Sequence, residues 1–456
     1  MGIMNPIRPD IIARFEGQRA PRYTSYPTAP HFTHAIDDAE YQMLLTGLPT
    51  EDSLSLYLHV PFCQTMCWYC GCHTRIVASY SPIEAYLKAL EAEIRMVAAA
   101  LPQRMKVRHI HWGGGTPTIM APEAFHGLMD TLRDCFELLP DAEVAVEIDP
   151  RRITDDMIRA LGNSGVTRAS LGVQSFDPVV QRAINRIQSY EQTASATDKL
   201  RSMGIEAVNF DLIYGLPHQT VDSCEQTVAQ ALRLAPDQLS VFGYAHVPWM
   251  KKHQRMIETA ALPNPQQRLA QFGAISEQLT DARYRRIGLD HFARPDDRLV
   301  RCLDAGILHR NFQGYTSDQC ATVIGFGASA VGTLPQAYVQ NTTQVGEYRR
   351  RIEAGSFALQ RGRRLTAEDR LRRDVIERIM CDFRVDLAAV GASHGVWPEH
   401  FMSELMRLAD LEQDGIVRIE GAVIALEEAY WPLARTAAAI FDAYLQPEEQ
   451  RHAAAI

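Results

Sequence analysis

The sequence predicts an α/β fold, a partial barrel of six parallel strands with an N-terminal arm and a C-terminal mainly helical domain. From about residue 54, short apolar segments alternate with longer amphipathic ones, which is typical of a parallel sheet covered by helices. Polar and glycine-rich residues follow the apolar segments. Because active sites of parallel barrels lie at the carboxyl ends of the strands, the same pattern places a functional site there.

The first strand is expected at 54–60, where Leu54, Leu56, Leu58 and Val60 alternate with polar residues. The following helix has one apolar face, because apolar residues recur every three or four positions. These positions are Ile83, Tyr86, Leu87, Leu90, Ile94 and Val97. Five further strands are expected, at 107–112, 143–149, 166–173, 207–214 and 239–244.

Three regions are expected: an arm at 1–50, the barrel domain at 51–355 and a mainly α-helical domain at 356–456. The arm is polar and punctuated by proline, so it either wraps the barrel near the mouth of the site or serves as a packing clip. In the last region Thr366 is positioned to cap a helix. The Asp414-Gly415 turn before 416–419 suggests a helix-and-ribbon module resembling a winged helix. A covering domain is favoured over DNA binding, because no helix concentrates basic residues.

Composition narrows the functional class. The chain has 456 residues, 46% of them hydrophobic, which is enough for a sizeable core. Its net charge of −9 argues against a general affinity for nucleic acid. No apolar run approaches the roughly 20 residues that span a bilayer, and no signal peptide is evident, so a cytoplasmic protein without membrane contact is expected.

Four of the nine cysteines lie within ten residues, at Cys63, Cys67, Cys70 and Cys72. The C-x-x-x-C-x-x-C spacing of the first three can turn three thiolates toward one inorganic core, and thiolates are the ligands that iron–sulfur clusters prefer. Three protein ligands leave one iron of a four-iron cluster free to bind another molecule. An iron–sulfur centre of this open type is therefore the favoured interpretation.

Two alternatives remain open. Structural zinc usually takes its ligands as two separated pairs, and no second pair is present. The other cysteines are single and scattered, at Cys135, Cys224, Cys302, Cys320 and Cys381. A disulfide framework is disfavoured because the chain is expected in a reducing compartment.

The motifs around the cysteines resemble those of the radical S-adenosylmethionine (SAM) superfamily, and within it the oxygen-independent coproporphyrinogen III oxidases. The resemblance covers nearly the whole chain, in blocks that follow the family's order. The blocks are Pro21-Arg22-Tyr23-Thr24-Ser25-Tyr26-Pro27, the cysteine loop with Cys72, Trp112-Gly113-Gly114-Gly115-Thr116-Pro117, Gly172-Val173-Gln174-Ser175-Phe176, Asp211-Leu212-Ile213-Tyr214-Gly215-Leu216-Pro217, Asp290-His291-Phe292-Ala293-Arg294 and His309-Arg310-Asn311-Phe312-Gln313-Gly314-Tyr315.

The resemblance implies a partial (β/α)6 radical SAM barrel with a [4Fe-4S] cluster and two molecules of SAM. The implied reaction is the oxidative decarboxylation of two propionate side chains of coproporphyrinogen III to vinyl groups, which gives protoporphyrinogen IX in haem biosynthesis. A 5′-deoxyadenosyl radical would abstract the hydrogen, and no oxygen is required. The resemblance also implies a tetrapyrrole substrate and a reduced flavodoxin- or ferredoxin-like electron donor, and a monomer is expected.

The site residues are carried over from the matching motif positions. Cys63, Cys67 and Cys70 would hold the cluster and, with Tyr57 and Glu147, carry the reaction. The cluster-bound SAM would contact Tyr57, Gly114, Glu147 and Val331. The second SAM would contact Gly115, Thr116, Gln174, Arg186, Asp211 and Ala245, with Tyr69 close by. Cys72 matches a cysteine that is not a ligand, and its role stays open.

Chemistry supports several of these positions. Glu147 and Asp211 end predicted strands, where a carboxylate can accept ribose hydroxyls or a cationic amino group. Arg186 can pair with a methionyl carboxylate through two parallel hydrogen bonds. Backbone groups of Gly113-Gly114-Gly115 can approach a bound molecule, because no side chain intervenes.

Two rival families share part of these motifs, the haem-transfer chaperones and the radical SAM methyltransferases that open the haem ring. The chaperones typically lack the early Pro-Arg-Tyr-Thr-Ser-Tyr-Pro block and a cysteine at the position of Cys72, whereas this chain has both. The oxidase family is therefore favoured. The residues that bind the substrate carboxylates stay unassigned.

Overall fold

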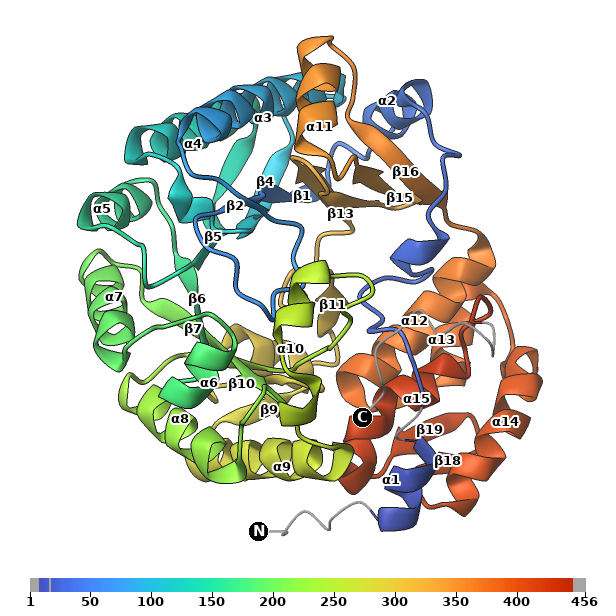
Figure 1. The fold of residues 1–456 in the computed structure, drawn as a ribbon. Helices are drawn as coiled ribbons and strands as arrows, with labels where there is room; N and C mark the ends of the chain where they lie inside the picture. The colour runs from blue at the N-terminus through green and yellow to red at the C-terminus, as the bar shows by residue number, and fades with distance from the viewer. Residues whose placement is uncertain (1–7, 16–17, 446–456) are drawn as a thin grey trace.

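The computed structural model describes residues 8–15 and 18–445, and its centre is one strongly curved sheet ringed by helices (Figure 1). Seven neighbouring strands run parallel. In sheet order they are β13 (Thr322–Phe326), β1 (Ser53–Val60), β4 (Lys106–Gly114), β5 (Glu137–Ile148), β6 (Arg168–Gln174), β7 (Ala207–Tyr214) and β8 (Gln238–Gly243). The predicted barrel of six parallel strands is confirmed, and β13 adds a parallel strand that was not predicted.

Helices cover the outer face of this sheet (Figure 1). They are α3 (Ser81–Ala100), α4 (Pro122–Cys135), α5 (Asp155–Asn163), α7 (Tyr190–Ser202), α8 (Val221–Arg233) and α9 (Pro265–Asp281). The short helix α6 (Pro178–Ala183) lies inside this ring (Figure 1), where Val180 packs with Leu216 and Tyr244. In α3 all six apolar positions expected to face the core are buried. The largest hydrophobic core lies between these helices and the strands, and strands bound by helices in this way hold their carboxyl ends in fixed positions.

Antiparallel strands extend the sheet at both edges, and none of them was predicted. Beyond β13 lie β14 (Val331–Leu334), β15 (Ala337–Asn341) and β16 (Leu359–Arg364), and beyond β8 lie β10 (His291–Ala293) and β9 (Arg285–Ile287). Smaller elements join them: β2 (Phe62–Cys63), β3 (Arg75–Ile76), α10 (Arg298–Asp304), β11 (His309–Asn311), β12 (Gly314–Thr316) and α11 (Val345–Glu353). Single 3₁₀ turns occur at Ala29–His31, Pro117–Ile119, Lys252–Met256, Thr259–Ala261, Pro398–Phe401 and Glu428–Leu433.

A buried carboxylate, Glu93 of α3, ties the barrel to the strands beyond β13. It accepts hydrogen bonds from the Gly327 amide at 2.6 Å, the Asn341 side-chain amide at 2.6 Å and the Tyr348 hydroxyl at 2.7 Å. Burial raises the pKa of Glu93 to about 7, and the three donors partly offset that effect. One side chain thus connects α3, β15, α11 and the turn after β13.

The C-terminal region forms the expected helix-and-ribbon module. It contains α12 (Ala367–Asp382), β17 (Arg384–Asp386), α13 (Leu387–His394), α14 (Met402–Gln413), β18 (Val417–Glu420), β19 (Val423–Leu426) and α15 (Ala434–Ala439). Thr366 caps α12 in a capping box with Asp369, as predicted. The three strands pair in the order β17-β19-β18.

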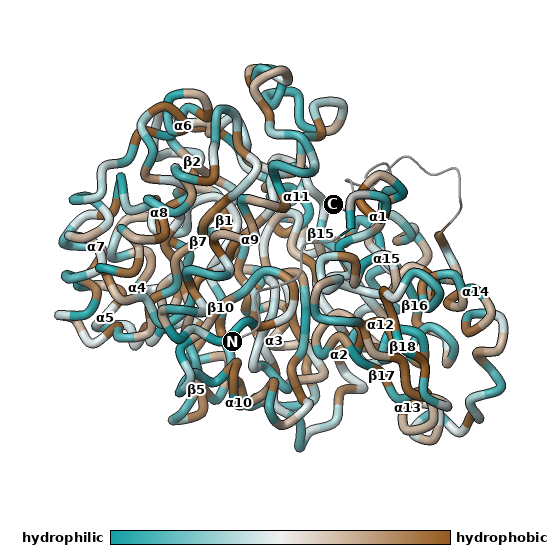
Figure 2. The backbone as a smooth tube through the Cα atoms, turned by 90° about the horizontal axis from the view of Figure 1, so that it is seen from below, coloured by the Kyte–Doolittle hydropathy of each residue, from teal (hydrophilic) through white to brown (hydrophobic). Residues whose placement is uncertain are grey.

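The N-terminal arm packs into this module and shares its hydrophobic core. In α1 (Pro9–Phe15), Ile11 and Phe15 join that core, as do Tyr23 and Tyr26 farther along the arm. The Tyr23 hydroxyl donates to Asp442 at 3.1 Å. Figure 2 shows two adjacent lobes, with α1 on the C-terminal one and α2 (Asp38–Thr46) nearer the barrel. The arm therefore belongs to the C-terminal core as much as to the barrel.

The predicted boundaries at 50/51 and 355/356 stay predictions. β16 lies after the second boundary yet pairs with β15 in the main sheet. Parts of the predicted arm (1–7 and 16–17) and of the predicted C-terminal domain (446–456) lie outside the described residues. Within the described ranges, no helix combines the length and apolar character needed to cross a membrane.

Candidate active site

A cavity of about 230 Å³ lies at the carboxyl ends of the parallel strands, beneath the cysteine loop. It brings together most of the residues that the sequence predicted. Those that line it are Cys63, Cys67, Tyr69, Cys70, Gly114, Gly115, Thr116, Glu147, Gln174, Arg186 and Asp211. Residues from five strands and the loop after β1 thus meet at one place.

Three predicted residues, Tyr57, Ala245 and Val331, do not line this cavity. The Tyr57 hydroxyl hydrogen-bonds His59 Nδ1 at 2.9 Å, and its ring lies 5.9 Å from that of His111. The carbonyl of Ala245 accepts from Gln254, whose amide also donates to the Tyr69 carbonyl. Val331 begins β14 and packs with Phe32 and Tyr338, among other residues. Their predicted contacts with SAM stay predictions.

The backbone of the cysteine loop is held by residues that the sequence did not point to. His253 Nε2 lies 2.7 Å from the Cys70 carbonyl, and Lys251 Nζ donates to the Cys72 carbonyl at 3.0 Å. On the other side, Asn185 donates to the Met66 carbonyl at 2.8 Å. The loop after β8 and the turn after α6 therefore fix the loop through main-chain contacts, which leaves its thiols free to bind ligands.

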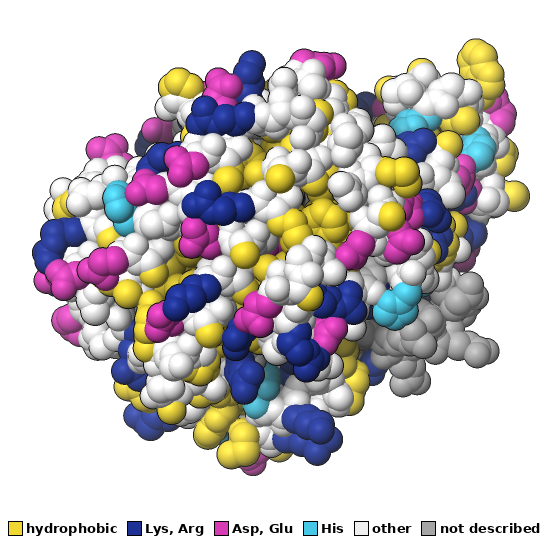
Figure 3. Space-filling model, turned by 90° about the horizontal axis from the view of Figure 1, so that it is seen from above, with side chains coloured by type: hydrophobic (Ala, Val, Ile, Leu, Met, Phe, Trp, Pro, Cys, Tyr) yellow, Lys and Arg dark blue, Asp and Glu magenta, His cyan; other side chains and the backbone are white. Residues whose placement is uncertain are grey.

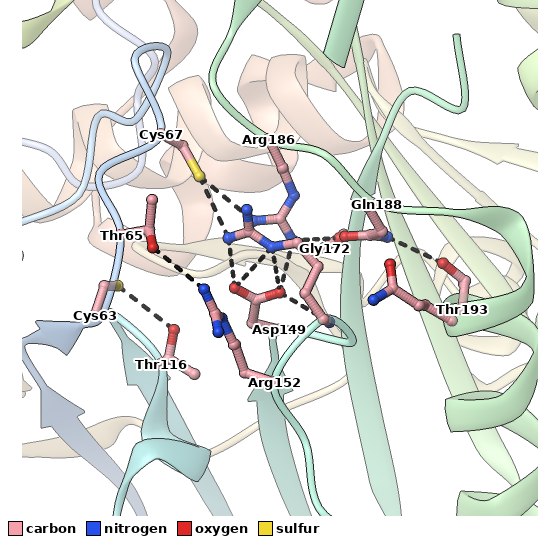
Figure 4. Close-up of polar contacts among 12 residues, drawn as sticks. Cys63, Thr65, Cys67, Thr116, Asp149, Arg152, Gly172, Arg186, Gln188 and Thr193 are labelled. Atoms are coloured by element: carbon pink, nitrogen blue, oxygen red, sulfur yellow. Dashed lines mark hydrogen bonds and ion pairs between the residues drawn. The ribbon is translucent and has the colours of Figure 1, made fainter. Parts of the chain in front are cut away.

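Cys67 lies against the guanidinium groups of Arg186 (Figure 4) and Arg151. Arg151 Nη2 and Arg186 Nη1 each lie 3.6 Å from Cys67 Sγ. Asp149 joins the two arginines, at 2.6 Å from Arg151 Nη2 and 3.4 Å from Arg186 Nη2. Burial would raise the pKa of the Asp149 carboxyl, but the two guanidinium charges outweigh it and lower the pKa. Two guanidinium groups thus hold the Cys67 side chain in place, and the role of Arg151 was not predicted.

The glycine stretch after β4 approaches the cysteine loop so closely that a side chain would not fit. The Gly115 amide donates to the Val60 carbonyl at 2.9 Å, and the Gly114 amide donates to Glu147 at 3.1 Å. A Cβ atom on Gly115 would lie 2.5 Å from the Phe62 carbonyl oxygen. Both amides donate within the chain and bring β4 against the loop. The predicted contacts of Gly114 and Gly115 with SAM stay predictions.

Two carboxylates face the cavity in different surroundings. Glu147 lies 3.3 Å from His111 Nε2 and accepts from the Gly114 amide. Asp211 accepts from the Ser170 hydroxyl and the Asn209 amide, both at 2.9 Å. Burial, followed by the charge of Glu147, raises the pKa of Asp211 to about 6. A cationic ligand would stabilise the ionised form of Asp211, so the buried carboxyl group favours binding of a cation.

The comparison with known proteins agrees with this geometry. The family model for the radical SAM superfamily matches residues 57–231, which include the cysteine loop and the cavity-lining strand ends up to β7. A curated relative from Bradyrhizobium diazoefficiens, an oxygen-independent coproporphyrinogen III oxidase, is 56% identical over 99% of this chain and 100% of its own length. The chain belongs to the oxygen-independent coproporphyrinogen III oxidase family. The resemblance inferred from the motifs is confirmed.

Other members of the family are similar over nearly their full length. The oxygen-independent coproporphyrinogen III oxidase of Escherichia coli K12 is 40% identical over 93% of both chains. The solved structure of coproporphyrinogen III oxidase from Escherichia coli, described as a radical SAM enzyme, superposes with a TM-score of 0.89 at 38% identity, covering 94% of this chain and 100% of that one. The fold class, with its helical C-terminal region, is thereby confirmed as well.

Oxidases of this family use a [4Fe-4S] cluster and SAM, and the residues present fit both groups. Cys63, Cys67 and Cys70 are free thiols on one cavity wall. In the part of the chain that the structure describes, no three His, Cys, Asp or Glu side chains converge to hold a single metal ion. A cluster spreads its ligands over several irons, so its thiolates need not meet at one point.

Arg186 provides the observation that the cavity fits SAM. Its side chain is 7% exposed, and its Nε has no hydrogen-bond partner within the described chain. A buried donor without a partner is costly, and a bound carboxylate would satisfy it. The thiol of Cys72 hydrogen-bonds that of Cys70 and lowers the pKa of Cys70, which bears on the open role of Cys72.

Proposed function

We propose that this protein catalyses the oxygen-independent oxidative decarboxylation of two propionate side chains of coproporphyrinogen III, giving protoporphyrinogen IX in haem biosynthesis. The observation that carries the proposal is the cavity in which three thiols and most of the predicted SAM residues meet, in a chain 56% identical to an oxidase of this name. At each propionate, a hydrogen atom leaves the β-carbon, the carboxylate leaves as CO₂, and one electron passes to an acceptor as the vinyl double bond forms.

The cluster and SAM supply, when bound, a 5′-deoxyadenosyl radical that removes the hydrogen atom. Cys63, Cys67 and Cys70 would hold the cluster. The Arg151–Asp149–Arg186 network would orient Cys67, since two guanidinium groups contact its sulfur.

The carboxylates and the arginine would bind the two SAM molecules. Asp211 offers a buried negative charge for a cationic amino group, and Arg186 offers an unpartnered nitrogen for a carboxylate. The remaining residues would contribute contacts around them, with Tyr57, Gly114, Glu147 and Val331 serving the cluster-bound SAM. Gly115, Thr116, Gln174 and Ala245 would serve the second, close to Tyr69.

The proposal extends to partners and location. A reduced flavodoxin- or ferredoxin-like protein would supply electrons to the cluster, and the enzyme would work as a cytoplasmic monomer. Figure 3 shows basic and acidic side chains intermingled on one face of the described residues. A general nucleic-acid site concentrates basic side chains, so we propose no nucleic-acid partner. Size-exclusion chromatography with light scattering tests the monomer.

The activity is tested in an anaerobic assay with SAM, a reductant, an electron acceptor and coproporphyrinogen III. Protoporphyrinogen and 5′-deoxyadenosine are expected to form together. Cys67→Ala should abolish both products, because the cluster loses a ligand, whereas Cys135→Ala, remote from the cavity, should retain them. Deoxyadenosine without decarboxylation would move the function to another tetrapyrrole, and normal turnover by Cys67→Ala would remove the cluster assignment.

A further inference from the structure

Four arginines from four separate elements meet beside the cofactor cavity. Arg22 comes from the arm, Arg268 from α9, Arg310 from β11 and Arg435 from α15. We call them the arginine cluster. The nearby carboxylate is Asp290, which lies 3.6 Å from Arg310 Nη1 and 2.8 Å from His291 Nδ1. Among the described residues, the charges of Arg22, Arg268 and Arg310 together exceed the single negative charge of Asp290.

The members of the cluster act on one another. Burial is the main cause that lowers the pKa of Arg22, and the positive charges of Arg310 and Arg268 lower it further. Burial lowers the pKa of Arg435 to about 10, and the charges of Arg22 and Arg310 contribute. Within the described residues, Arg22 and Arg268 form no ion pair with a carboxylate. Among the described residues, Arg22 and Arg268 are therefore held beside Arg310 with no carboxylate partner of their own, which is unfavourable unless an anion binds.

Arg310 supplies an independent observation. Its side chain is only 6% exposed, yet its Nε and Nη1 have no hydrogen-bond partner in the described chain. Arg310 and the arm residues Tyr23 to Tyr26 also line a second cavity of about 810 Å³. This volume lies in the range of small-molecule sites. Of the four arginines, Arg310 is the one that lines this second cavity.

The arginine cluster borders the cofactor cavity. Phe242 lines that cavity, and the carbonyl of the next residue, Gly243, accepts from Arg22 Nη2 at 3.2 Å. The Tyr244 carbonyl accepts from Arg268 Nη1 at 2.9 Å. Phe242 also contacts the His291 ring edge to face, with centroids 5.7 Å apart. An anion held by the cluster would therefore lie next to the end of β8, beside the place where the chemistry occurs.

We infer that the arginine cluster binds propionate carboxylates of the tetrapyrrole substrate and so orients it toward the cofactor cavity. The inference rests on the proposed function and names the recognition site that the sequence left unassigned. Guanidinium groups bind carboxylates through paired hydrogen bonds, and several of them match a substrate with several carboxylates. The arm and the C-terminal module each contribute one arginine, so both become parts of the binding site.

The test measures binding of coproporphyrin III, the stable oxidised form, by fluorescence under anaerobic conditions, and the KM for coproporphyrinogen III. Arg22→Gln is the main variant because the Arg22 side chain makes one hydrogen bond, to a carbonyl, so its loss disturbs few contacts within the described chain. We expect its Kd and KM to rise about tenfold or more. Arg310→Gln should act in the same direction. Arg418→Gln, 63% exposed in the C-terminal module, is the matched control and should change neither constant.

The tetramethyl ester of coproporphyrin separates carboxylate recognition from general apolar binding. Wild-type protein should bind the ester about tenfold or more weakly than the acid. The Arg22→Gln substitution should weaken binding of the acid and leave binding of the ester unchanged. Variants that retain wild-type Kd and KM within twofold, at wild-type iron content, would overturn the inference while wild-type turnover keeps the proposed function. Wild-type protein that binds the acid through the cluster but forms no protoporphyrinogen would overturn the proposed function instead.

Discussion

Replacing Asp211 by Asn should stabilise the protein while weakening SAM binding. The pKa of Asp211 is about 6 in the folded protein, against an ordinary value of 3.8. This difference corresponds to about 3 kcal/mol that ionisation of Asp211 costs the folded state above pH 6. Water that reaches the side chain reduces the figure, and the variant loses about 1 kcal/mol of hydrogen bonding with Ser170 and Asn209. A net gain of about 1–2 kcal/mol is expected at pH 7.5.

The pH dependence identifies the cause. Because the pKa is raised on folding, the wild type is most stable, relative to the variant, below pH 3.8 and loses that advantage as pH rises through 6. The stability difference between Asp211→Asn and wild type should therefore grow by about 1 kcal/mol between pH 5.0 and pH 7.5. Urea unfolding at matched iron content measures it, with exposed Asp296→Asn as the control.

The ligand side of the same variant is measured by anaerobic calorimetry. If Asp211 binds the amino group of the second SAM, its Kd should rise about tenfold or more, because a charge-assisted hydrogen bond is lost. A variant less stable than wild type at pH 7.5, or a stability difference independent of pH, would refute the electrostatic reasoning. Unchanged SAM binding would refute the ligand assignment alone.

Two further variants test the framework of the site. Gly115→Ala should lower iron content and cost about 1–3 kcal/mol of stability, since its Cβ would lie 2.5 Å from the Phe62 oxygen. Gly127→Ala, with no atom within 4 Å, is its control, and equal iron content in the two would contradict the close packing. Glu93→Ala should cost about 3–5 kcal/mol in urea unfolding, because three donors lose their acceptor. Exposed Glu84→Ala should cost below about 0.5 kcal/mol, and a similar value for Glu93→Ala would show that its network contributes little.

The central strands were predictable because parallel strands buried on both faces appear as short apolar runs. The helix α3 was predictable from the spacing of Ile83 to Val97. β13 and the edge strands were missed, since they are only three to six residues long and include polar positions such as Gln340 and Arg361. Their strand conformation depends on pairing with distant neighbours more than on local preference.

Some residues of the site were predictable from the sequence and others were not. Cys63, Cys67 and Cys70 stand in one local motif, so the sequence alone indicates them. Arg151 and His253 reach the cysteine loop only through the fold, and a solitary Arg or His carries no local signal. The arm's apolar residues Ile11 and Phe15 likewise gave no sign of their partners, which lie near the other end of the chain.

The contact between arm and C-terminal module has a consequence for synthesis on the ribosome. Tyr23 and its partner Asp442 are separated by 419 positions. At about 5–20 residues per second, the arm waits on the order of 20–80 seconds after its own synthesis before that partner exists. The barrel strands can pair in the meantime, but Arg22 is positioned only when the last helix has emerged. A prematurely terminated chain would therefore retain the cysteine loop yet lack the assembled arginine cluster.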